Sequence, residues 1–338
     1  MDETRVHDTW THDQAVIDRR RFLARFGLLA GAAALAPLAR GLRATGARPG
    51  RLEISRPALG TWLRVVVQHR DPEVMQRALR DALAAVQTVD MQMSVHRDDS
   101  QLVRVNDRAG RDGARVDAAV LEVVGLANAA AARTAGVYDP TVLPLMRLYG
   151  FYGSARTSRP TAREVDHVLS RMGYAGVRID RGHDTLALDR EGAGLDLGSI
   201  GKGWAVDRAA DALRARGVRS GLVDLGGNVY GIGAPDEDSP GWTVGVFHPV
   251  TGALDRTFVL RDAAVATSGN SEQYHMLGTT RIGHLFDARR GQPADGHLSA
   301  SVVAARGVDS DIGSTVAFLL GPDRFRGWPG ALDAHFIG

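Results

Sequence analysis

The sequence contains no cysteine among its 338 residues. Disulfides, thiolate metal sites, iron–sulfur clusters, a nucleophilic thiol and a lipid-modified cysteine anchor are therefore excluded. A bound metal would have to use oxygen or imidazole ligands. Lysine is nearly absent as well: Lys202 is the only lysine in the sequence, which has forty arginines. The hydrophobic fraction of 44% and the charged fraction of 24% are those of a globular protein with an ample core.

The chain also lacks a strongly basic body. The formal net charge is +2, and residues 1–50 carry eight arginines against five acidic residues. The remaining residues have 33 basic and 34 acidic side chains, so their net charge is −1. A near-neutral body gives no electrostatic reason to bind DNA or RNA. We therefore expect no nucleic-acid partner.

The N-terminal segment is typical of a twin-arginine export signal. Arg19-Arg20-Arg21-Phe22-Leu23 fits the R-R-x-F-L pattern, and the uncharged apolar run Phe26–Leu38 follows it. This run is shorter than the ~20 apolar residues that a membrane span needs. We predict that residues 1–46 are a signal peptide and leader read by the twin-arginine export machinery. Residues 47–338 then form a single domain of a periplasmic protein, with no stable membrane span in its mature form.

The rest of the chain predicts a mixture of helices and strands without internal repeats. Helices are predicted over residues 72–93, 117–135, 162–172, 203–216 and 311–320. Strands are predicted over residues 63–67, 177–179, 186–188, 195–197, 222–223, 242–247, 257–260 and 301–304. Because the two kinds of element do not alternate regularly, the order favours an α+β fold with antiparallel or mixed sheets over a doubly wound fold.

Lys202 lies in a glycine-rich segment, Leu195-Asp196-Leu197-Gly198-Ser199-Ile200-Gly201-Lys202-Gly203. The pattern predicts a strand, a close backbone approach at the glycines and then a helix start. The N-terminus of a helix together with a lysine charge suits a phosphate group. The segment is not a P-loop, since that motif needs glycine at position 196 and serine or threonine at position 203. A surface lysine at a helix entrance is the alternative, but its uniqueness favours a functional role.

Asp311 and Thr315 are separated by one helical turn, so a carboxylate and a hydroxyl share one face of the last predicted helix. Such oxygen groups suit Mg²⁺, although an aspartate at a helix start is more often a cap. His284 is predicted on a short strand before a polar turn, on the same face as Phe286. The motifs H-E-x-x-H and G-x-S-x-G are absent, which removes the commonest zinc-protease and α/β-hydrolase interpretations.

Taken together, these segments resemble one family over residues from about 53 to 337, the ApbE-type FAD:protein FMN transferases. The resembling blocks occur in the family's order. They are Leu59-Gly60-Thr61, Met93-Ser94-Val95-His96 with Ser100 to Asn106, Gly136-Val137-Tyr138-Asp139-Pro140-Thr141-Val142 with Pro144-Leu145 and Leu148-Tyr149-Gly150-Phe151, Leu195 to Asp207, Val223 to Gly227, Ala266-Thr267-Ser268-Gly269, His284 to Pro293 and Asp311 to Thr315. The resemblance implies an ApbE-like, T-fold-related α+β domain whose two lobes enclose a flavin cleft.

The resemblance also implies roles for individual residues. FAD, as the substrate, is expected to contact Leu59, His96, Val137, Tyr138, Asp139, Asp196, Lys202 and Leu285. Mg²⁺ is expected to be held by the main-chain carbonyl of Ser199 and by the side chains of Asp311 and Thr315. A threonine or serine hydroxyl of an acceptor flavoprotein would attack the FMN-side phosphorus and release AMP. Lys202 and His284 are the expected catalytic residues, with His284 as the base.

The implied acceptor is a periplasmic respiratory flavoprotein of the NosR, Rnf or Nqr type, carrying a threonine or serine flavinylation motif. A twin-arginine leader on this domain is typical of the NosX-like subgroup, which is linked to nitrous oxide respiration. Two positions depart from the family pattern, because His96 replaces an aromatic residue and Ala288 replaces the proline that usually follows Asp287. The alternatives are an FAD pyrophosphatase that releases free FMN and AMP, and a non-catalytic flavin-binding assembly factor of the periplasm.

Overall fold

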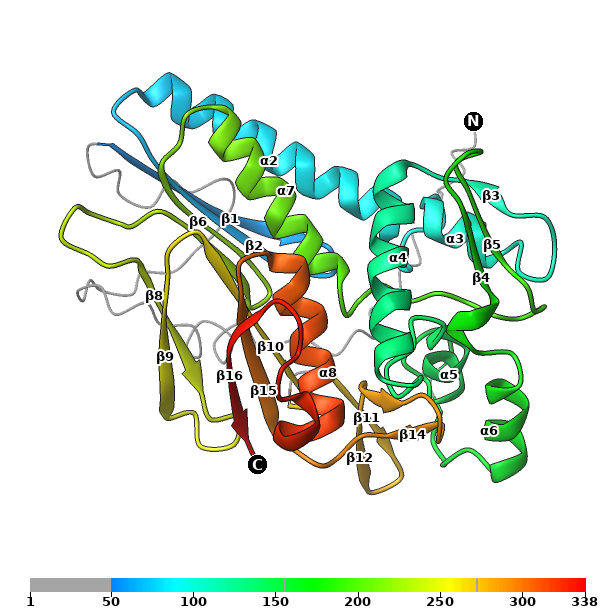
Figure 1. The fold of residues 1–338 in the computed structure, drawn as a ribbon. Helices are drawn as coiled ribbons and strands as arrows, with labels where there is room; N and C mark the ends of the chain where they lie inside the picture. Colours follow the sequence, from blue (N-terminus) through cyan, green and yellow to red (C-terminus); the bar gives the residue numbers. More distant parts are fainter. Residues whose placement is uncertain (1–49, 155, 272) are drawn as a thin grey trace, which may run out of the picture.

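The computed structural model describes residues 50–154, 156–271 and 273–338. One half of this part of the chain is an antiparallel sheet of seven strands, in the order β1-β2-β6-β7-β10-β15-β16 (Figure 1). The strands are β1 (Arg51–Ala58), β2 (Thr61–Gln68), β6 (Ser220–Leu225), β7 (Asn228–Ile232), β10 (Ala263–Gly269), β15 (Ser299–Ala304) and β16 (Ala331–Ile337). The N-terminal leader predicted over residues 1–46 lies outside the described residues.

Two tight turns determine the register at one end of this sheet. The β1–β2 turn is formed by Leu59 and Gly60, with φ angles of 47° and 71°. The β6–β7 turn is formed by Gly226 and Gly227, with φ angles of 59° and 87°. Positive φ at both central residues matches the twist of paired strands and favours glycine. Leu59 adopts this conformation although leucine rarely does.

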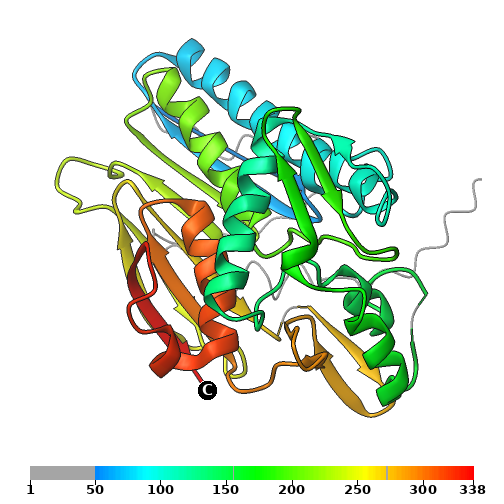
Figure 2. The ribbon, with the colours of Figure 1, turned by 45° about the vertical axis from the view of Figure 1, so that its right-hand side comes forward.

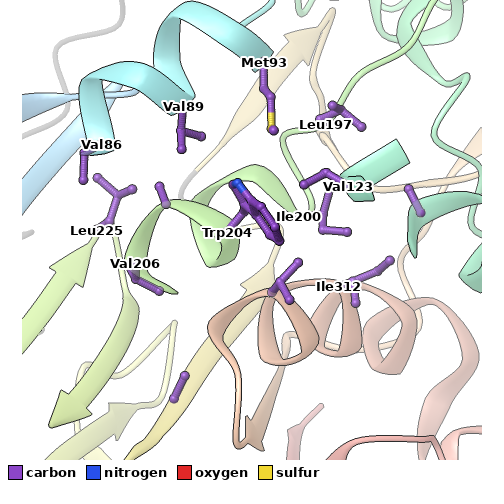
Figure 3. Packing of buried hydrophobic residues seen from close by; sticks show 14 of the residues in the cluster. Val86, Val89, Met93, Val123, Leu197, Ile200, Trp204, Val206, Leu225 and Ile312 are labelled. Atoms are coloured by element: carbon purple, nitrogen blue, oxygen red, sulfur yellow. The ribbon is translucent and has the colours of Figure 1, made fainter. Parts of the chain in front are cut away.

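Three helices cover one face of the sheet, namely α2 (Pro72–Met93), α7 (Gly201–Ala215) and α8 (Gly307–Phe325). The α2 helix begins where the Asp71 carboxylate accepts a hydrogen bond from the Glu73 N–H at 2.8 Å and proline occupies the first turn. Figure 3 shows Trp204 of α7 packed between Met93 of α2 and Ile312 of α8. This apolar layer fixes the starts of α7 and α8 relative to each other.

A hairpin covers the opposite face of the sheet. It consists of β8 (Trp242–Phe247) and β9 (Leu254–Leu260), and the Trp242 indole N–H donates to the Ile232 carbonyl at 3.0 Å. In β2, Val65 and Val67 pack under the helices, whereas Val66 packs against the hairpin. Because this part of β2 is buried on both faces, residues 65–67 are three consecutive valines and do not alternate with polar residues.

The other half of the molecule is built from short elements, and Figure 2 shows it beside the sheet half. Its helices are α3 (Gln101–Asn106), α4 (Ala118–Arg133), α5 (Leu143–Leu148), α6 (Ala162–Leu169) and the 3₁₀ turn η1 (Tyr174–Gly176). Its strands are β3 (Ala114–Arg115), β4 (Val177–Asp180), β5 (Thr185–Leu188), β11 (Tyr274–Leu277), β12 (Thr280–Gly283), β13 (Phe286–Asp287) and β14 (Gln292–Pro293). A separate small core holds α5, α6 and the β11–β12 hairpin together.

The architecture confirms the predicted α+β class with antiparallel sheets. The predicted strand at residues 195–197 is wrong, because that segment is irregular: Leu195 N–H donates to the Asn106 side chain and Asp196 N–H to the Pro140 carbonyl. His284 is not within a strand either, since it lies in the two-residue connection between β12 and β13. Among the described helices, none is long and apolar enough to cross a bilayer.

Candidate active site

The starts of α7 and α8 exchange hydrogen bonds. The Asp311 carboxylate of α8 accepts from the Gly203 N–H of α7 at 2.8 Å. In return, the Asp207 carboxylate of α7 accepts from the Gly307 and Val308 N–H groups of α8 at 2.5 and 2.9 Å. Each helix therefore satisfies free N–H groups in the first turn of the other. Asp311 does act as a cap, but on the neighbouring helix.

Ser199 lies just before α7, outside its ladder of hydrogen bonds. The first helical hydrogen bond of α7 runs from the Trp204 N–H to the Ile200 carbonyl at 3.0 Å. The Gly203 N–H is therefore one of the free donors of the first turn, and Asp311 accepts it. The Ser199 carbonyl stands next to this helix start and is a candidate ligand for a cation.

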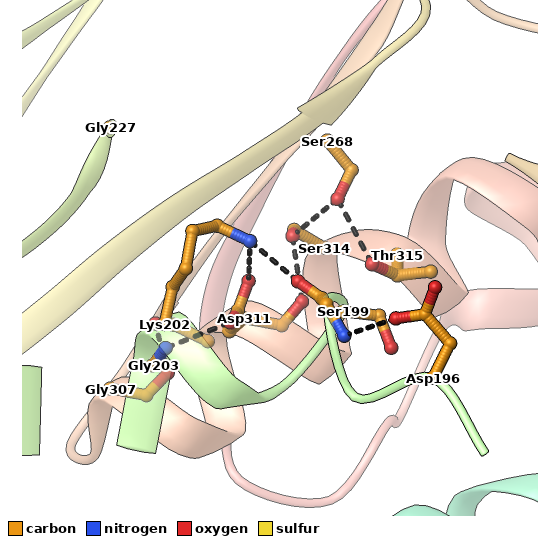
Figure 4. A network of polar contacts seen from close by, with 12 residues as sticks. Asp196, Ser199, Lys202, Gly203, Gly227, Ser268, Gly307, Asp311, Ser314 and Thr315 are labelled. Carbon is orange, nitrogen blue, oxygen red and sulfur yellow. Dashed lines mark hydrogen bonds and ion pairs between the residues drawn. The ribbon is translucent and has the colours of Figure 1, made fainter. Parts of the chain in front are cut away.

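Lys202 lies in the first turn of α7, which begins two residues earlier than the predicted start at residue 203. Its Nζ donates to the Gly198 carbonyl at 2.6 Å and lies 3.8 Å from Oδ1 of Asp311 (Figure 4). The lysine side chain is 29% exposed, so part of it reaches solvent. The ammonium group thus stands beside a helix N-terminus, where an anionic group is stabilised by both charges.

Asp311 is 3% exposed. Burial raises the pKa of its carboxyl, and the Lys202 ammonium, the Gly203 N–H and a hydrogen bond from the Asn228 side chain act in the opposite direction. Asn228 is the first residue of β7 and is placed by the Gly226-Gly227 turn. Its Oδ1 is buried without a hydrogen-bond partner. A buried acceptor of this kind needs a donor from a bound molecule or water.

Three hydroxyl groups gather beside Asp311. Ser268 at the end of β10 contacts Ser314 at 2.8 Å and Thr315 at 3.1 Å, both oxygen to oxygen (Figure 4). Ser314 donates in turn to the main-chain carbonyl of Asp311 at 2.8 Å. Thr315 is therefore placed on the same face of α8 as Asp311, as the four-residue spacing predicted.

Asp196 and two tyrosines form a second polar group next to the glycine segment. The Tyr152 hydroxyl donates to Asp196 at 2.8 Å, and Gly198 N–H donates to the other carboxylate oxygen at 2.7 Å. The Tyr138 hydroxyl lies 3.0 Å from the Ser199 hydroxyl. Burial raises the pKa of both tyrosines, so both remain protonated donors. The His96 ring meets Tyr152 edge-on at 5.3 Å between centroids, so an aromatic pair persists at this position.

His284 has one ring nitrogen engaged. Its Nδ1 lies 3.1 Å from the Gln273 carbonyl, which can only accept, so Nδ1 carries the proton of the neutral ring. Burial lowers the pKa of His284 to about 4. The Lys202 charge lowers it further, whereas the hydrogen bond to Gln273 acts in the opposite direction. The neutral imidazole therefore keeps a lone pair on Nε2 at neutral pH.

The remaining residues expected to contact FAD have different surroundings. The Asp139 carboxylate accepts from the Thr141 hydroxyl and N–H and from the Tyr174 N–H, so it organises its own loop. The Val137 carbonyl accepts from Ala288 N–H, which joins the segment after α4 to the segment after His284. Leu285 is buried in the main core, and Leu59 packs against the same core from the β1–β2 turn.

The donor set at the start of α7 and α8 fits a hard cation. It contains one carboxylate, one hydroxyl and one main-chain carbonyl, from Asp311, Thr315 and Ser199, and all are oxygen ligands. Within residues 50–338, apart from the two gaps, no three His, Cys, Asp or Glu side chains gather in a metal-binding cluster. A site with a single carboxylate suits Mg²⁺, which commonly completes its octahedron with water and substrate phosphates.

Three polar residues of this region were not predicted as site residues. Tyr152, Ser268 and Asn228 each contact a predicted residue, respectively Asp196, Thr315 and Asp311. Ser268 lies within a block that resembles the family, and Tyr152 and Asn228 each directly follow one, so their positions were a usable signal. Asn228 follows a Gly-Gly turn, and its role depends on strand pairing that the local sequence does not specify.

Comparisons with known proteins identify the relatives of this chain. The model of the ApbE family matches residues 59–334. An FAD:protein FMN transferase of Treponema pallidum is 32% identical over 320 residues, covering 88% of each chain. One of Klebsiella pneumoniae is 32% identical over 237 residues, covering 69% of this chain and 72% of that protein.

Solved structures show the same fold. An ApbE protein from Thermotoga maritima superposes with a TM-score of 0.76 and 28% identity, over 85% of this chain and 94% of that one. The flavin transferase ApbE from Vibrio cholerae superposes with a TM-score of 0.73 and 25% identity, over 85% and 97% of the two chains. With a family match over most of its length and relatives at this identity and coverage, the chain belongs to the ApbE family.

Proposed function

We propose that this protein is an FAD:protein FMN transferase that moves FMN from FAD to a threonine or serine hydroxyl of an acceptor protein and releases AMP. The observation that carries the proposal is the approach of the Lys202 ammonium to Asp311, 3.8 Å away, at the start of α7 and next to Ser199 (Figure 4). Its relatives in Treponema and Klebsiella carry the same activity in their names. The helix N-terminus and the lysine charge suit the negative pyrophosphate of FAD, and the oxygen ligands suit a cation bound to that pyrophosphate.

The residues that would hold Mg²⁺ are Ser199, Asp311 and Thr315. When bound there, the ion would supply charge neutralisation to the FAD pyrophosphate. Lys202 adds a second positive charge, and its hydrogen bond to the Gly198 carbonyl keeps the ammonium group directed along the glycine segment. Phosphoryl-type transfer depends mainly on positioning and charge neutralisation, so the chain needs no covalent nucleophile.

His284 is the proposed base. Its Nε2 lone pair accepts the proton of the acceptor hydroxyl as the oxygen of that hydroxyl forms a bond to the FMN-side phosphorus. The bond from this phosphorus to the bridging oxygen breaks, and AMP leaves with that oxygen. The Gln273 carbonyl supports this role because it fixes the proton on Nδ1. General base catalysis of this kind contributes ~10²–10⁴-fold in rate.

The physiological setting belongs to the same proposal. The leader with Arg19-Arg20 supports export by the twin-arginine route and a periplasmic location. The proposed acceptor is a periplasmic respiratory flavoprotein of the NosR, Rnf or Nqr type, and nitrous oxide respiration is the process that the NosX-like leader suggests.

The test mixes residues 47–338 with FAD, Mg²⁺ and a flavin-acceptor domain, and scores in-gel flavin fluorescence together with AMP release. A fluorescent acceptor with an equal amount of AMP is the expected result. AMP without labelled protein would identify an FAD pyrophosphatase. Binding of FAD with neither product would identify a non-catalytic flavin-binding assembly factor.

The metal assignment is tested by Asp311→Asn, which keeps the size of the side chain and removes its charge. We expect a loss of at least about 100-fold in transfer, the scale of losing an electrostatic group at a reacting centre. Asp309→Asn is the matched control, because Asp309 lies on the same helix but pairs with Arg306 at 3.8 Å. Equal activity of the two variants would refute the metal site.

A further inference from the structure

Ser268 has no assigned role, although it connects two residues of α8. It is the last residue but one of β10, and its hydroxyl lies between those of Ser314 and Thr315 (Figure 4). Ser314 is fully buried and Thr315 is 5% exposed. Ser268 itself is half-buried. Water therefore has little access to the two α8 hydroxyls, and Ser268 is the group that reaches them from the sheet.

The proton positions in this cluster follow from counting donors. A main-chain carbonyl only accepts, so the Ser314 hydroxyl must donate to the Asp311 carbonyl, 2.8 Å away. Each hydroxyl has a single proton, so Ser314 accepts from Ser268. The Ser268 proton is then used, and Thr315 must donate to Ser268. The cluster is thus a one-way relay from Thr315 through Ser268 and Ser314 to the Asp311 carbonyl.

This relay determines which part of the Thr315 hydroxyl is free. Its proton points to Ser268, so both oxygen lone pairs are available on the remaining sides. A cation ligand must present lone pairs and not a proton. Because the relay ends on the main chain of Asp311, the hydroxyl ligand and the carboxylate ligand of the proposed Mg²⁺ site are connected through Ser268.

We propose that Ser268 is a positioning residue for the cation site, which fixes the rotation of the Thr315 hydroxyl so that its lone pairs face the ion. This inference rests on the proposed function, because it needs Thr315 and Asp311 to be metal ligands. Without Ser268, the Thr315 proton is free to rotate toward the ion. Loss of an outer-shell partner of a metal ligand typically weakens metal binding by 10–100-fold.

The experiment measures binding of Mn²⁺, a paramagnetic substitute for Mg²⁺, to residues 47–338 without FAD by electron paramagnetic resonance. We expect Ser268→Ala to raise the Kd for Mn²⁺ at least about tenfold, while Ser268→Thr, which keeps a hydroxyl, stays close to wild type. Ser301→Ala is the matched control, because Ser301 is also a strand serine in a hydroxyl pair, 2.8 Å from Thr267. It should keep the wild-type Kd.

A double-mutant cycle separates this role from a general structural effect. In a Thr315→Ala background, Ser268→Ala should cause no further rise in the Kd, because the hydroxyl that it orients is gone. The thermal midpoint of the metal-free protein should fall equally little in Ser268→Ala and Ser301→Ala. A wild-type Kd in Ser268→Ala, or equal effects with and without Thr315, would overturn the proposal.

The same assay distinguishes this inference from the proposed function. If Asp311→Asn abolishes Mn²⁺ binding and Ser268→Ala leaves it intact, only the relay is wrong. If Asp311→Asn and Thr315→Ala both bind Mn²⁺ as the wild type does, the metal site is wrong and the relay falls with it.

Discussion

His284 has its proton fixed on Nδ1 and a pKa well below that of an ordinary histidine. Its pKa is lowered to about 4 because burial and the nearby Lys202 charge both oppose protonation, whereas an ordinary histidine titrates near ~6.5. The form that accepts a proton is the neutral one, and it is lost only as the pH falls through the lowered pKa. A histidine in this environment therefore remains a base in mildly acidic solution.

We expect kcat/KM for FMN transfer to stay level from neutral pH down to the mildly acidic range, and to fall only near the lowered pKa. His284→Gln should reduce the rate ~10²–10⁴-fold. His183→Gln is the control, since His183 is 82% exposed and pairs with Asp180 on the surface. A pH–rate profile measured for wild type and both variants checks this, and an acid limb centred near pH ~6.5 would contradict the environment derived for His284.

Lys202 illustrates what composition alone reveals about a residue. Its uniqueness and its place before a helix pointed to an anion site, and the structure places its Nζ 3.8 Å from Asp311. The partner itself was not derivable from the residues, because Asp311 lies 109 positions further along the chain. The pair exists only because α7 and α8 begin side by side.

At the scale of elements, the crossing of α7 and α8 depends on two glycines. A Cβ atom on Gly203 would lie 2.2 Å from the Gly307 carbonyl oxygen, and one on Gly307 would lie 2.5 Å from that of Gly203. The helix starts touch backbone to backbone as a result. This contact brings the Gly203 N–H, a free donor of the first turn of α7, to Asp311.

We expect Gly203→Ala to lower the free energy of unfolding by ~1–3 kcal/mol, because the added methyl group forces the two helices apart. Gly201→Ala is the control on the same helix, since its Cβ would meet nothing within 4 Å. It should be neutral or stabilising by ~0.5–1 kcal/mol, the usual gain of alanine over glycine in a helix. Urea denaturation of residues 47–338 measures both, and equal stabilities would contradict the close contact.

The helices were more predictable than the strands for a physical reason. The predicted helix over residues 72–93 coincides with α2, because its cap, its proline and its apolar period are all local signals. The predicted strand at residues 195–197 was wrong although Leu195 and Leu197 are both buried. Burial of alternate residues does not require a strand, and here distant groups take the backbone hydrogen bonds.

At the scale of the whole molecule, the predicted leader concerns where the protein goes, and the domain concerns what it does. The family match begins at residue 59, after the proposed leader, so the proposed destination and the chemistry belong to separate parts of the chain. Export by the twin-arginine route would carry the protein across the membrane already folded, and a chain without cysteine needs no oxidative folding afterwards.

We expect the double substitution of Arg19→Lys and Arg20→Lys to keep the protein in the cytoplasm of a host with twin-arginine machinery, because this route requires the arginine pair. The control is Arg25→Lys, which keeps the same charge after the pair. Cell fractionation with immunoblotting measures the periplasmic share. An unchanged share in the double variant would contradict the proposed route.

The sequence by itself determined the class of fold, the long helices, the absence of thiol chemistry and the position of the one lysine. These features depend on composition, on local periodicity and on short motifs. It also located Asp311 and Thr315 on one helix face, because four residues make about one turn.

Only the tertiary structure decided how these groups work together. The exchange of caps between α7 and α8 and the contact of Asn228 with Asp311 both join residues far apart in sequence. The direction of the relay through Ser268 likewise exists only because β10 ends beside α8. Local sequence sets which groups a segment offers, whereas packing of distant segments sets which of these groups meet and which remain free for a ligand.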